Sequence, residues 1–303
     1  MLSLLAATAA SETVGPAIQW ADLGLTEGIE LGFFTLRWYS LAYLGGIIFG
    51  YWHLSKMIKA PGAPMAQRHA DDLFFYCTLG IILGGRLGYA LFYKPELFVG
   101  FEGDGFVSWE LLRLWDGGMS FHGGLIGVLL AIAWVSRQGN LSFMRVCDYI
   151  AVNVPMGMML GRLANFVNGE LWGRTTDVPW AMSFPEIYNG TLIAGPPRHP
   201  SQLYEAALEG LVLLIILLLM FWKTRARYRP GLLVGIFTVG VAGGRFIVEF
   251  FREPDAHLAE FAANTGLSMG QWLTIPLILL GLVVTLVALR KEPLASGGAK
   301  AAD

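Results

Sequence analysis

The segment at residues 272–289 constrains this chain most, because its 18 residues include no charged side chain. A helix of that length rises about 27 Å, close to the roughly 30 Å thickness of a bilayer's hydrocarbon core. A second run, residues 210–222, is also free of charge and ends at a basic stretch. Overall, 55% of the residues are hydrophobic and only 15% are charged, against roughly 25% charged residues in soluble domains. The sequence therefore predicts a membrane protein.

Weaker apolar segments bring the number of predicted spans to seven. They occupy residues 38–55, 73–93, 119–135, 149–163 and 231–251. The chain also has 38 glycines among 303 residues, nearly double the usual share of about 7%, which is typical of closely packed membrane helices. We therefore predict an all-α polytopic membrane protein that forms a single integral-membrane domain over residues 1–303.

The basic residues predict how the chain is oriented in the membrane. Twelve of the 21 lysines and arginines fall in the segments after the first, third, fifth and seventh predicted spans, and six fall on the other side. Because basic residues favour the cytoplasmic side, the N-terminus is predicted to lie outside and the C-terminus in the cytoplasm. The long outer segment at residues 164–200, with many Gly, Pro and aromatic residues, is predicted to form a small external head between the fourth and fifth spans.

Several functional classes find no support in the sequence. A formal net charge of −2 gives no indication of nucleic-acid binding. The two cysteines, Cys77 and Cys147, form neither a disulfide framework nor a zinc-binding spacing. The chain has no GxSxG elbow of a serine hydrolase and no HExxH zinc motif. We expect the protein to use no metal and no diffusible cofactor.

A few polar residues lie within or beside the predicted spans, where ionisable groups are costly and are usually paired or functional. Three pairs have a spacing of three or four residues, so that both members share a helix face: Arg162 with Asn165, Arg245 with Glu249, and Glu205 with Glu209. One interpretation is that these residues form internal ion pairs that hold the helices together.

The other interpretation is a binding site for an anionic lipid headgroup. The predicted topology places His122, Arg162, Asn165, Arg245 and Glu249 in the outer half of the membrane or at its outer surface. The planar guanidinium of arginine suits bidentate recognition of phosphate or carboxylate. Arg86 is either a further cation of this site or a partner for a buried carboxylate. His122 either makes a structural hydrogen bond or transfers a proton.

Several blocks of sequence resemble the bacterial prolipoprotein diacylglyceryl transferases. The longest is GRLANFVNGELWGR at residues 161–174. Other matching blocks follow the family's order: RWYSLAY at 37–43, GGRLGYALFY at 84–93, HGGLIG at 122–127, RHPSQLYEA at 198–206 and GGRFIVEFFREPD at 243–255. The resemblance covers nearly the whole chain, and the ordered set is far more specific than any single block.

The resemblance implies a seven-helix enzyme of the bacterial inner membrane, with its active site open to the outer leaflet and the periplasm. Such enzymes transfer the diacylglyceryl group of phosphatidylglycerol to the lipobox cysteine in the signal peptide of a prolipoprotein, and they release glycerol phosphate. The family's critical positions correspond here to Tyr39, His122, Arg162, Asn165, Glu170, Gly173, Arg245 and Glu249. One departure is Val241, because relatives often have a tyrosine one turn before the arginine of the last block.

These residues suggest a division of roles. Arg162 and Arg245 are predicted to hold the phosphate. Tyr39 and Asn165 are predicted to donate hydrogen bonds to the headgroup, and Arg86 to make a further headgroup contact. Gly173 is predicted to allow a close backbone approach. Glu249 would orient Arg245, and Glu170 would either orient Arg162 or bind the glycerol hydroxyls. His122 is the preferred general base, with Glu249 or Glu170 as alternatives.

Competing hypotheses are an anion transporter, which the nearly charge-free inner halves of the spans disfavour, and a purely structural or lipid-binding membrane protein.

Overall fold

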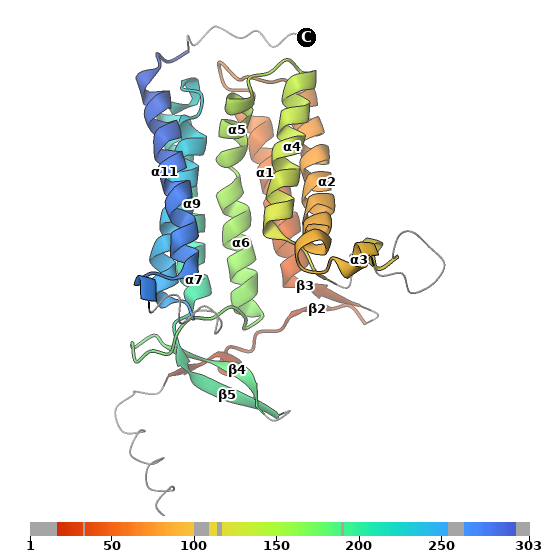
Figure 1. Cartoon of the computed structure of the whole chain (residues 1–303), viewed down its shortest axis with the longest axis vertical. Helices are drawn as coiled ribbons and strands as arrows, with labels where there is room; N and C mark the ends of the chain where they lie inside the picture. Colours follow the sequence, from red (N-terminus) through yellow and green to blue (C-terminus); the bar gives the residue numbers. More distant parts are fainter. Residues whose placement is uncertain are drawn as a thin grey trace, which may run out of the picture. The chain divides into compact units, whose positions relative to one another are not determined.

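A computed structural model of the chain describes residues 17–32, 34–99, 109–113, 117–188, 191–253 and 264–294. Over these residues the protein is mostly helical, with two small β-sheets (Figure 1). In this described part, five helical segments are long and apolar enough to cross a membrane: Gln67–Phe92, Phe143–Val167, Ser201–Lys223, Leu232–Phe251 and Met269–Arg290. These segments agree with the prediction of a helical membrane protein.

The five segments coincide with the second, fourth, fifth, sixth and seventh predicted spans. The second, fourth, fifth and seventh begin earlier than predicted, at Gln67, Phe143, Ser201 and Met269. The first and third predicted spans coincide with two other helices, α1 (Trp38–Met57) and α4 (Phe121–Gln138). That seven helices span the membrane, and in which direction, remains a prediction, and both ends of the chain lie outside the described residues.

The chain divides into two compact units. The first comprises Met1–Gly46, Val154–Thr224 and Gly235–Val287, and the second comprises Ile47–Asn153, Arg225–Val234 and Ala288–Asp303. Three helices contribute residues to both units: α1, α9 (Leu232–Val248) and α11 (Met269–Arg290). The single domain over residues 1–303 remains a prediction.

The first unit contains α6 (Val154–Val167) and a continuous helix of three parts. The parts are α7 (Ser201–Glu205), a π-helical segment η4 (Ala206–Val212) and α8 (Leu213–Lys223). These helices approach closely, since a Cβ atom on Gly210 would lie 2.5 Å from the Cβ of Met159. In the same unit α9 continues into a 3₁₀ helix, η6 (Glu249–Phe251).

The first unit also contains β-strands, which the prediction of an all-α fold missed. β4 (Met182–Tyr188) and β5 (Thr191–Arg198) form an antiparallel hairpin (Figure 1). The short strand β1 (Ile18–Gln19) pairs with β4 in parallel, and the 3₁₀ helix η1 (Trp20–Leu23) follows it in the chain. A second sheet pairs β2 (Gly28–Glu30) with β3 (Thr35–Arg37). The hairpin lies within the predicted head segment 164–200. Prolines in both of its strands obscure the alternating pattern from which strands are usually predicted.

The second unit contains α2 (Gln67–Phe92) and α4, which lie side by side (Figure 1), together with α3 (Glu96–Val99), η2 (Trp109–Leu112), α5 (Phe143–Ala151) and η5 (Ala226–Tyr228). Glycines bring the backbones of α2 and α4 together. A Cβ on Gly84 would lie 2.3 Å from the carbonyl oxygen of Gly123, and one on Gly127 would lie 2.1 Å from that of Gly80. Close packing of membrane helices through glycine, expected from the composition, is therefore present here.

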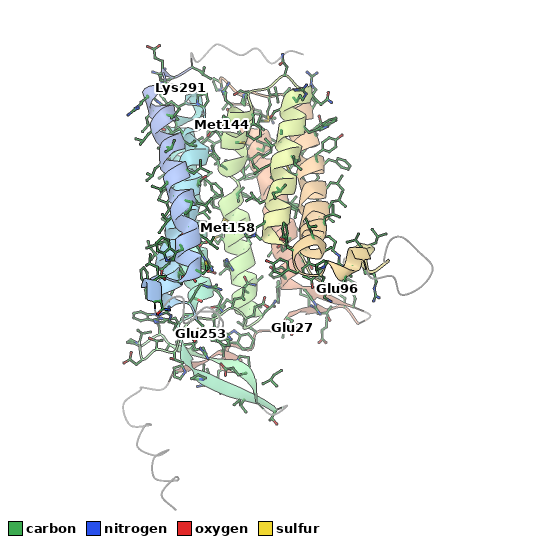
Figure 2. The ribbon with its side chains drawn as sticks, in the orientation of Figure 1. Glu27, Glu96, Met144, Met158, Glu253 and Lys291 are labelled. Atoms are coloured by element: carbon green, nitrogen blue, oxygen red, sulfur yellow. The ribbon has the colours of Figure 1, made fainter. Side chains whose placement is uncertain are left out.

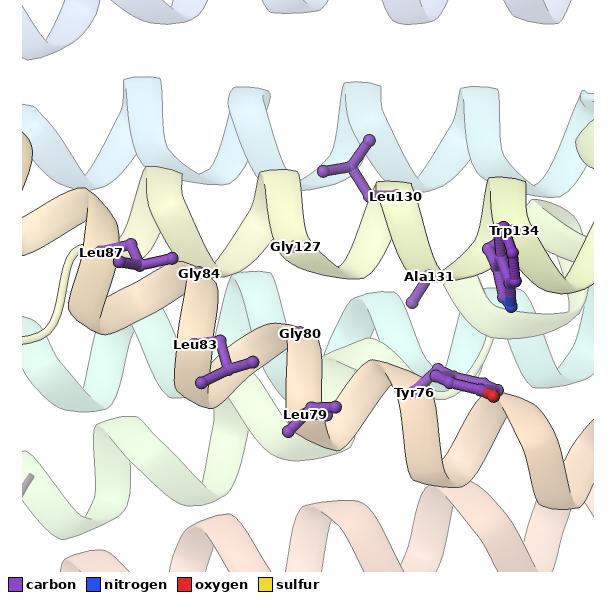
Figure 3. A pocket seen from close by; sticks show the side chains of 10 residues that line it. All are labelled: Tyr76, Leu79, Gly80, Leu83, Gly84, Leu87, Gly127, Leu130, Ala131 and Trp134. Atoms are coloured by element: carbon purple, nitrogen blue, oxygen red, sulfur yellow. The ribbon is translucent and has the colours of Figure 1, made fainter. Parts of the chain in front are cut away.

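An apolar pocket of about 380 Å³ lies along the same helix pair (Figure 3). Its lining is made of Tyr76, Leu79, Gly80, Leu83, Gly84 and Leu87 from α2 and of Gly127, Leu130, Ala131 and Trp134 from α4. The lining includes no arginine, lysine or histidine, so this pocket is not the predicted site for an anionic headgroup.

Candidate active site

Glu205, the last residue of α7, is completely buried and forms ion pairs with three arginines. Its Oε2 lies 2.9 Å from Nε of Arg162 on α6. Its Oε1 lies 2.6 Å from Nη1 of Arg245 on α9 and 3.1 Å from Nη1 of Arg252, which follows η6. A buried carboxylate is tolerated when it is paired and hydrogen-bonded, so Glu205 and the three arginines depend on one another.

Glu249 is a second carboxylate of the same group. Its Oε2 lies 3.1 Å from Nη2 of Arg245 and 3.6 Å from Nε of Arg252, and Ser268 Oγ donates a hydrogen bond of 3.1 Å to its Oε1. The local helix geometry explains both pairs. Arg245 precedes Glu249 by four residues, one α-helical turn, whereas Arg252 follows it by three, one turn of the 3₁₀ helix η6. The predicted pairing of Arg245 with Glu249 is thus present. We call Arg162, Arg245, Arg252, Glu205 and Glu249 the arginine cluster.

The helix that carries Glu205 has an unusual geometry directly after it. Residues Ala206–Val212 form a π-helical segment, a conformation that is rare and often found at functional sites. This segment carries Glu209, which is buried and whose Oε1 has no hydrogen-bond partner among the described residues. The backbone of α9 is close, since a Cβ on Gly244 would lie 3.0 Å from Cγ of Glu209. Glu205 and Glu209, which the spacing treats alike, therefore have different surroundings.

The loop after α6 is held by Glu170. Nδ2 of Asn165 donates a hydrogen bond of 2.8 Å to Oε1 of Glu170, and the buried Gln202 donates to the backbone carbonyl of Glu170. Leu171 has a φ of 59°, in the left-handed region that bulky residues rarely adopt. Arg162 is paired with Glu205 and not with Glu170, which corrects one of the two roles predicted for Glu170. The other role, binding of the glycerol hydroxyls, remains a prediction.

Gly173 is the point where this loop meets the end of η6. Its N–H donates to the carbonyl of His199 at 2.9 Å, and it forms an antiparallel bridge with Arg252. A Cβ at this position would lie 2.2 Å from the carbonyl oxygen of Phe251, too close for any residue but glycine. Arg174 adds a hydrogen bond of 2.6 Å from its Nε to the carbonyl of Arg252. The predicted close backbone approach at Gly173 is therefore present, and the partner is the backbone of residues 251–252.

Arg198, at the end of β5, supports the same loop. It pairs with Glu186 at 3.1 Å and with Glu253 at 2.9 Å, the latter labelled in Figure 2. Its guanidinium carbon also lies 3.9 Å from the ring centroid of Trp172. Burial lowers the pKa of the adjacent His199, which favours its neutral form. The positive charge of Arg198 is thus compensated by the two carboxylates.

Two further predicted residues are exposed. Tyr39, near the start of α1, has its ring centroid 5.2 Å from that of Tyr43. In the second unit, His122 is the second residue of α4, and its ring packs edge-on against Phe121 at a centroid distance of 5.7 Å. An exposed imidazole is accessible to substrate, and the roles of both residues remain predictions.

Arg86 is also in the second unit, and it is buried. Its Nε donates to the carbonyl of Leu111 at 2.9 Å, and its Nη1 donates to the carbonyls of Gly117 and Gly118. Arg86 therefore holds the backbone that leads into α4. Its predicted contact with the headgroup remains a prediction.

Sequence reasoning identified Arg162, Arg245 and Glu249 as members of one site, and the structure brings them together. Sequence reasoning missed Arg252, and it did not predict that Glu205 pairs with three arginines at once. A signal for Arg252 was present, because it follows Glu249 by three residues in the same sequence block. Among the described residues, no group of three His, Cys, Asp or Glu side chains is arranged to bind a metal.

Comparison with known proteins identifies the family. The sequence profile of the family described as prolipoprotein diacylglyceryl transferase matches residues 27–287. The chain is 62% identical to the phosphatidylglycerol–prolipoprotein diacylglyceryl transferase of Erythrobacter litoralis, over 93% of this chain and 96% of that protein. Proteins of the same name from Zymomonas mobilis and Rhodospirillum rubrum are 49% and 47% identical, over 89% and 90% of this chain and 90% and 95% of their own lengths. The chain belongs to the prolipoprotein diacylglyceryl transferase family.

Proposed function

We propose that this chain transfers the diacylglyceryl group of phosphatidylglycerol to the lipobox cysteine of a prolipoprotein, and that the arginine cluster is the site that holds the lipid phosphate. Its relatives carry the name of this activity. One observation carries the proposal for the site. Arg162 from α6, together with Arg245 and Arg252 from α9 and the end of η6, converges on one completely buried carboxylate of a third helix.

Arg162 and Arg245 are suited to bind a phosphodiester. Arg162 contacts Glu205 through Nε, which leaves its two terminal amino groups outside that ion pair. The side chains of Arg162 and Arg245 are 26% and 27% exposed, which leaves them accessible to a ligand. Positive charge is worth more where water is scarce, so these guanidinium groups both bind the phosphate and stabilise charge on the departing group.

The nucleophile in this scheme is the substrate's cysteine. Its sulfur attacks the glyceryl carbon that carries the phosphodiester, a carbon–sulfur bond forms, and the carbon–oxygen bond breaks with its electron pair passing to the phosphate oxygen. Glycerol phosphate leaves, and the thiol proton passes to a general base. The chain's own Cys77 and Cys147 are therefore not needed, and Cys147 is buried in α5.

His122 is the proposed base, because its side chain is exposed and histidine is the side chain that most often acts as a general base. The alternatives are already engaged, since Glu249 forms an ion pair with Arg245 and Glu170 accepts a hydrogen bond from Asn165. Tyr39 and the second N–H of the Asn165 amide are proposed to donate to the headgroup. Gly173 acts by allowing the loop between α6 and β4 (residues 168–181, the head loop) to reach residues 251–252. Arg86 is kept as a further headgroup contact.

The proposed setting is the bacterial inner membrane, crossed seven times, with the N-terminus outside and the C-terminus in the cytoplasm. The distribution of basic residues supports this orientation. It places the arginine cluster toward the outer leaflet and the periplasm, where a prolipoprotein presents its lipobox. Reporter fusions at residues 139 and 294 test the topology, since both positions should be cytoplasmic.

The decisive experiment uses purified chain reconstituted in vesicles that contain phosphatidylglycerol, together with a lipobox peptide. We expect the peptide to gain the mass of one diacylglyceryl group on its cysteine. Arg162→Ala and Arg245→Ala should nearly abolish the gain while the protein remains folded. Anion flux without a modified peptide would favour a transporter, and lipid binding without a product would favour a lipid-binding protein.

A further inference from the structure

We propose that Arg252 is a positioning residue of the phosphate site. Its guanidinium supplies the one positive charge by which the arginines of the cluster outnumber the carboxylates they pair with. The inference rests on the proposed function and extends it to a residue outside the predicted set. Arg252 contacts both carboxylates of the cluster, Glu205 at 3.1 Å and Glu249 at 3.6 Å. Its side chain is 21% exposed, close to the values for Arg162 and Arg245.

The charges of the cluster are not balanced. Three arginines are ion-paired with two carboxylates, so the ion-paired groups carry one positive charge in excess. Glu209 lies within electrostatic reach of the same arginines, but it forms no ion pair with a described residue, and a buried carboxyl group without such a partner favours its neutral form. A phosphodiester carries one negative charge at neutral pH, and it therefore completes the balance. Without Arg252 the remaining ion-paired groups would be neutral as a set. An incoming phosphodiester would then introduce an uncompensated charge beside the buried Glu205, which is costly.

Other nearby arginines do not provide this excess. The guanidinium of Arg198 is paired with both Glu186 and Glu253. Arg174 directs its Nε to the backbone carbonyl of Arg252 and forms no ion pair with a described residue. Arg252 differs from both because its guanidinium forms ion pairs with the same two carboxylates that pair with Arg245.

The backbone of Arg252 connects this charge to the head loop. Three contacts fix the end of η6 against that loop. Arg252 forms the antiparallel bridge with Gly173, and Arg174 donates two hydrogen bonds, from its N–H to the carbonyl of Phe251 at 2.9 Å and from its Nε to the carbonyl of Arg252 at 2.6 Å. Because these contacts attach the backbone of Arg252 to the loop, a shift of the loop also moves the arginine relative to Glu205. Arg252 thus couples the geometry of the head loop to the charge of the phosphate site.

The test compares full-length R252Q, R252K and the double variant R252Q/E249Q in phosphatidylglycerol vesicles with a lipobox peptide. R290Q serves as the matched control, since it removes one positive charge from an exposed side chain at the end of α11. We expect R252Q to lower kcat/KM about 10- to 100-fold, the effect of losing a hydrogen bond to a charged group. We expect a raised KM for phosphatidylglycerol, near-normal activity for R252K, and no change for R290Q.

The double variant separates charge from simple structure. R252Q/E249Q restores the excess of one positive charge, so it should be about 2- to 100-fold more active than R252Q, as expected for coupled neighbouring charges. The inference is overturned if R252Q is as active as R290Q. It is also overturned if neither R252K nor the double variant recovers activity although their thermal unfolding temperatures are normal. If the wild-type chain modifies no peptide, the proposed function fails instead, and the two failures are thereby distinguished.

Discussion

Replacing Glu205 by glutamine tests most directly whether the arginine cluster has a common centre. The change keeps the size and shape of the side chain and removes its negative charge. Three arginines lose their shared partner, and only Glu249 remains to compensate them. We therefore expect Glu205→Gln to destabilise the fold and to weaken the transfer reaction together.

The magnitude follows from burial. Removing one partner of a buried ion pair typically costs about 3–5 kcal/mol, because the other partner keeps its charge without compensation. Here Glu205 is 0% exposed, but its arginines are 21–27% exposed and keep part of their hydration. The lower limit applies, so we expect a loss of about 3 kcal/mol in the free energy of unfolding, roughly a 100-fold change in the equilibrium constant.

The assay is denaturant unfolding of the detergent-solubilised protein, with transfer to a lipobox peptide measured in parallel. Glu186→Gln is the matched control, because Glu186 is 29% exposed and pairs with the single arginine Arg198. A partly exposed pair contributes only about 0–1 kcal/mol. If Glu205→Gln proves as stable and as active as Glu186→Gln, the cluster does not depend on its buried carboxylate, and the reasoning is refuted.

Three other substitutions probe separate parts of the scheme. Gly173→Ala places a methyl group 2.2 Å from a backbone oxygen, so we expect a loss of about 1–3 kcal/mol in unfolding measurements and reduced transfer, whereas Gly161→Ala, with nothing within 4 Å, should show only a minor change. His122→Asn should lower kcat at least about 100-fold if the imidazole is the base, and substantial residual turnover would exclude that role. The variant with both Cys77→Ser and Cys147→Ser should keep near-normal kcat, and loss of transfer by correctly folded protein would argue against a nucleophile supplied by the substrate.

Local spacing explains which parts of the site could be predicted. Arg245 and Glu249 belong to one helix, and their separation by four residues is sufficient to place them together. The helical segments were predictable for a similar reason, since long apolar runs have few other structures available in a membrane. The strands β4 and β5 were not, because both contain prolines, so their residue pattern does not distinguish them from a loop.

The partner of Arg162 shows where local spacing ends. The sequence offered Glu170, eight residues further along, and the structure instead provides Glu205 from another helix. Arg245 and Arg252 reach the same carboxylate across 40 and 47 residues of chain. No periodicity links residues so far apart, because their proximity is created by the packing of α6, α7 and α9.

Glu205 and Glu209 make the same point within a single helix. Both are buried glutamates, four residues apart, and the sequence gives no reason to rank one above the other. Glu205 faces three guanidinium groups, whereas Oε1 of Glu209 meets no hydrogen-bond donor among the described residues and its side chain packs against Gly244. The difference arises from the neighbouring helices and from the π-helical turn between the two residues. A carboxylate in a membrane helix can therefore contribute to the proposed phosphate site only where other helices bring arginines to it, and Glu205 has such arginines.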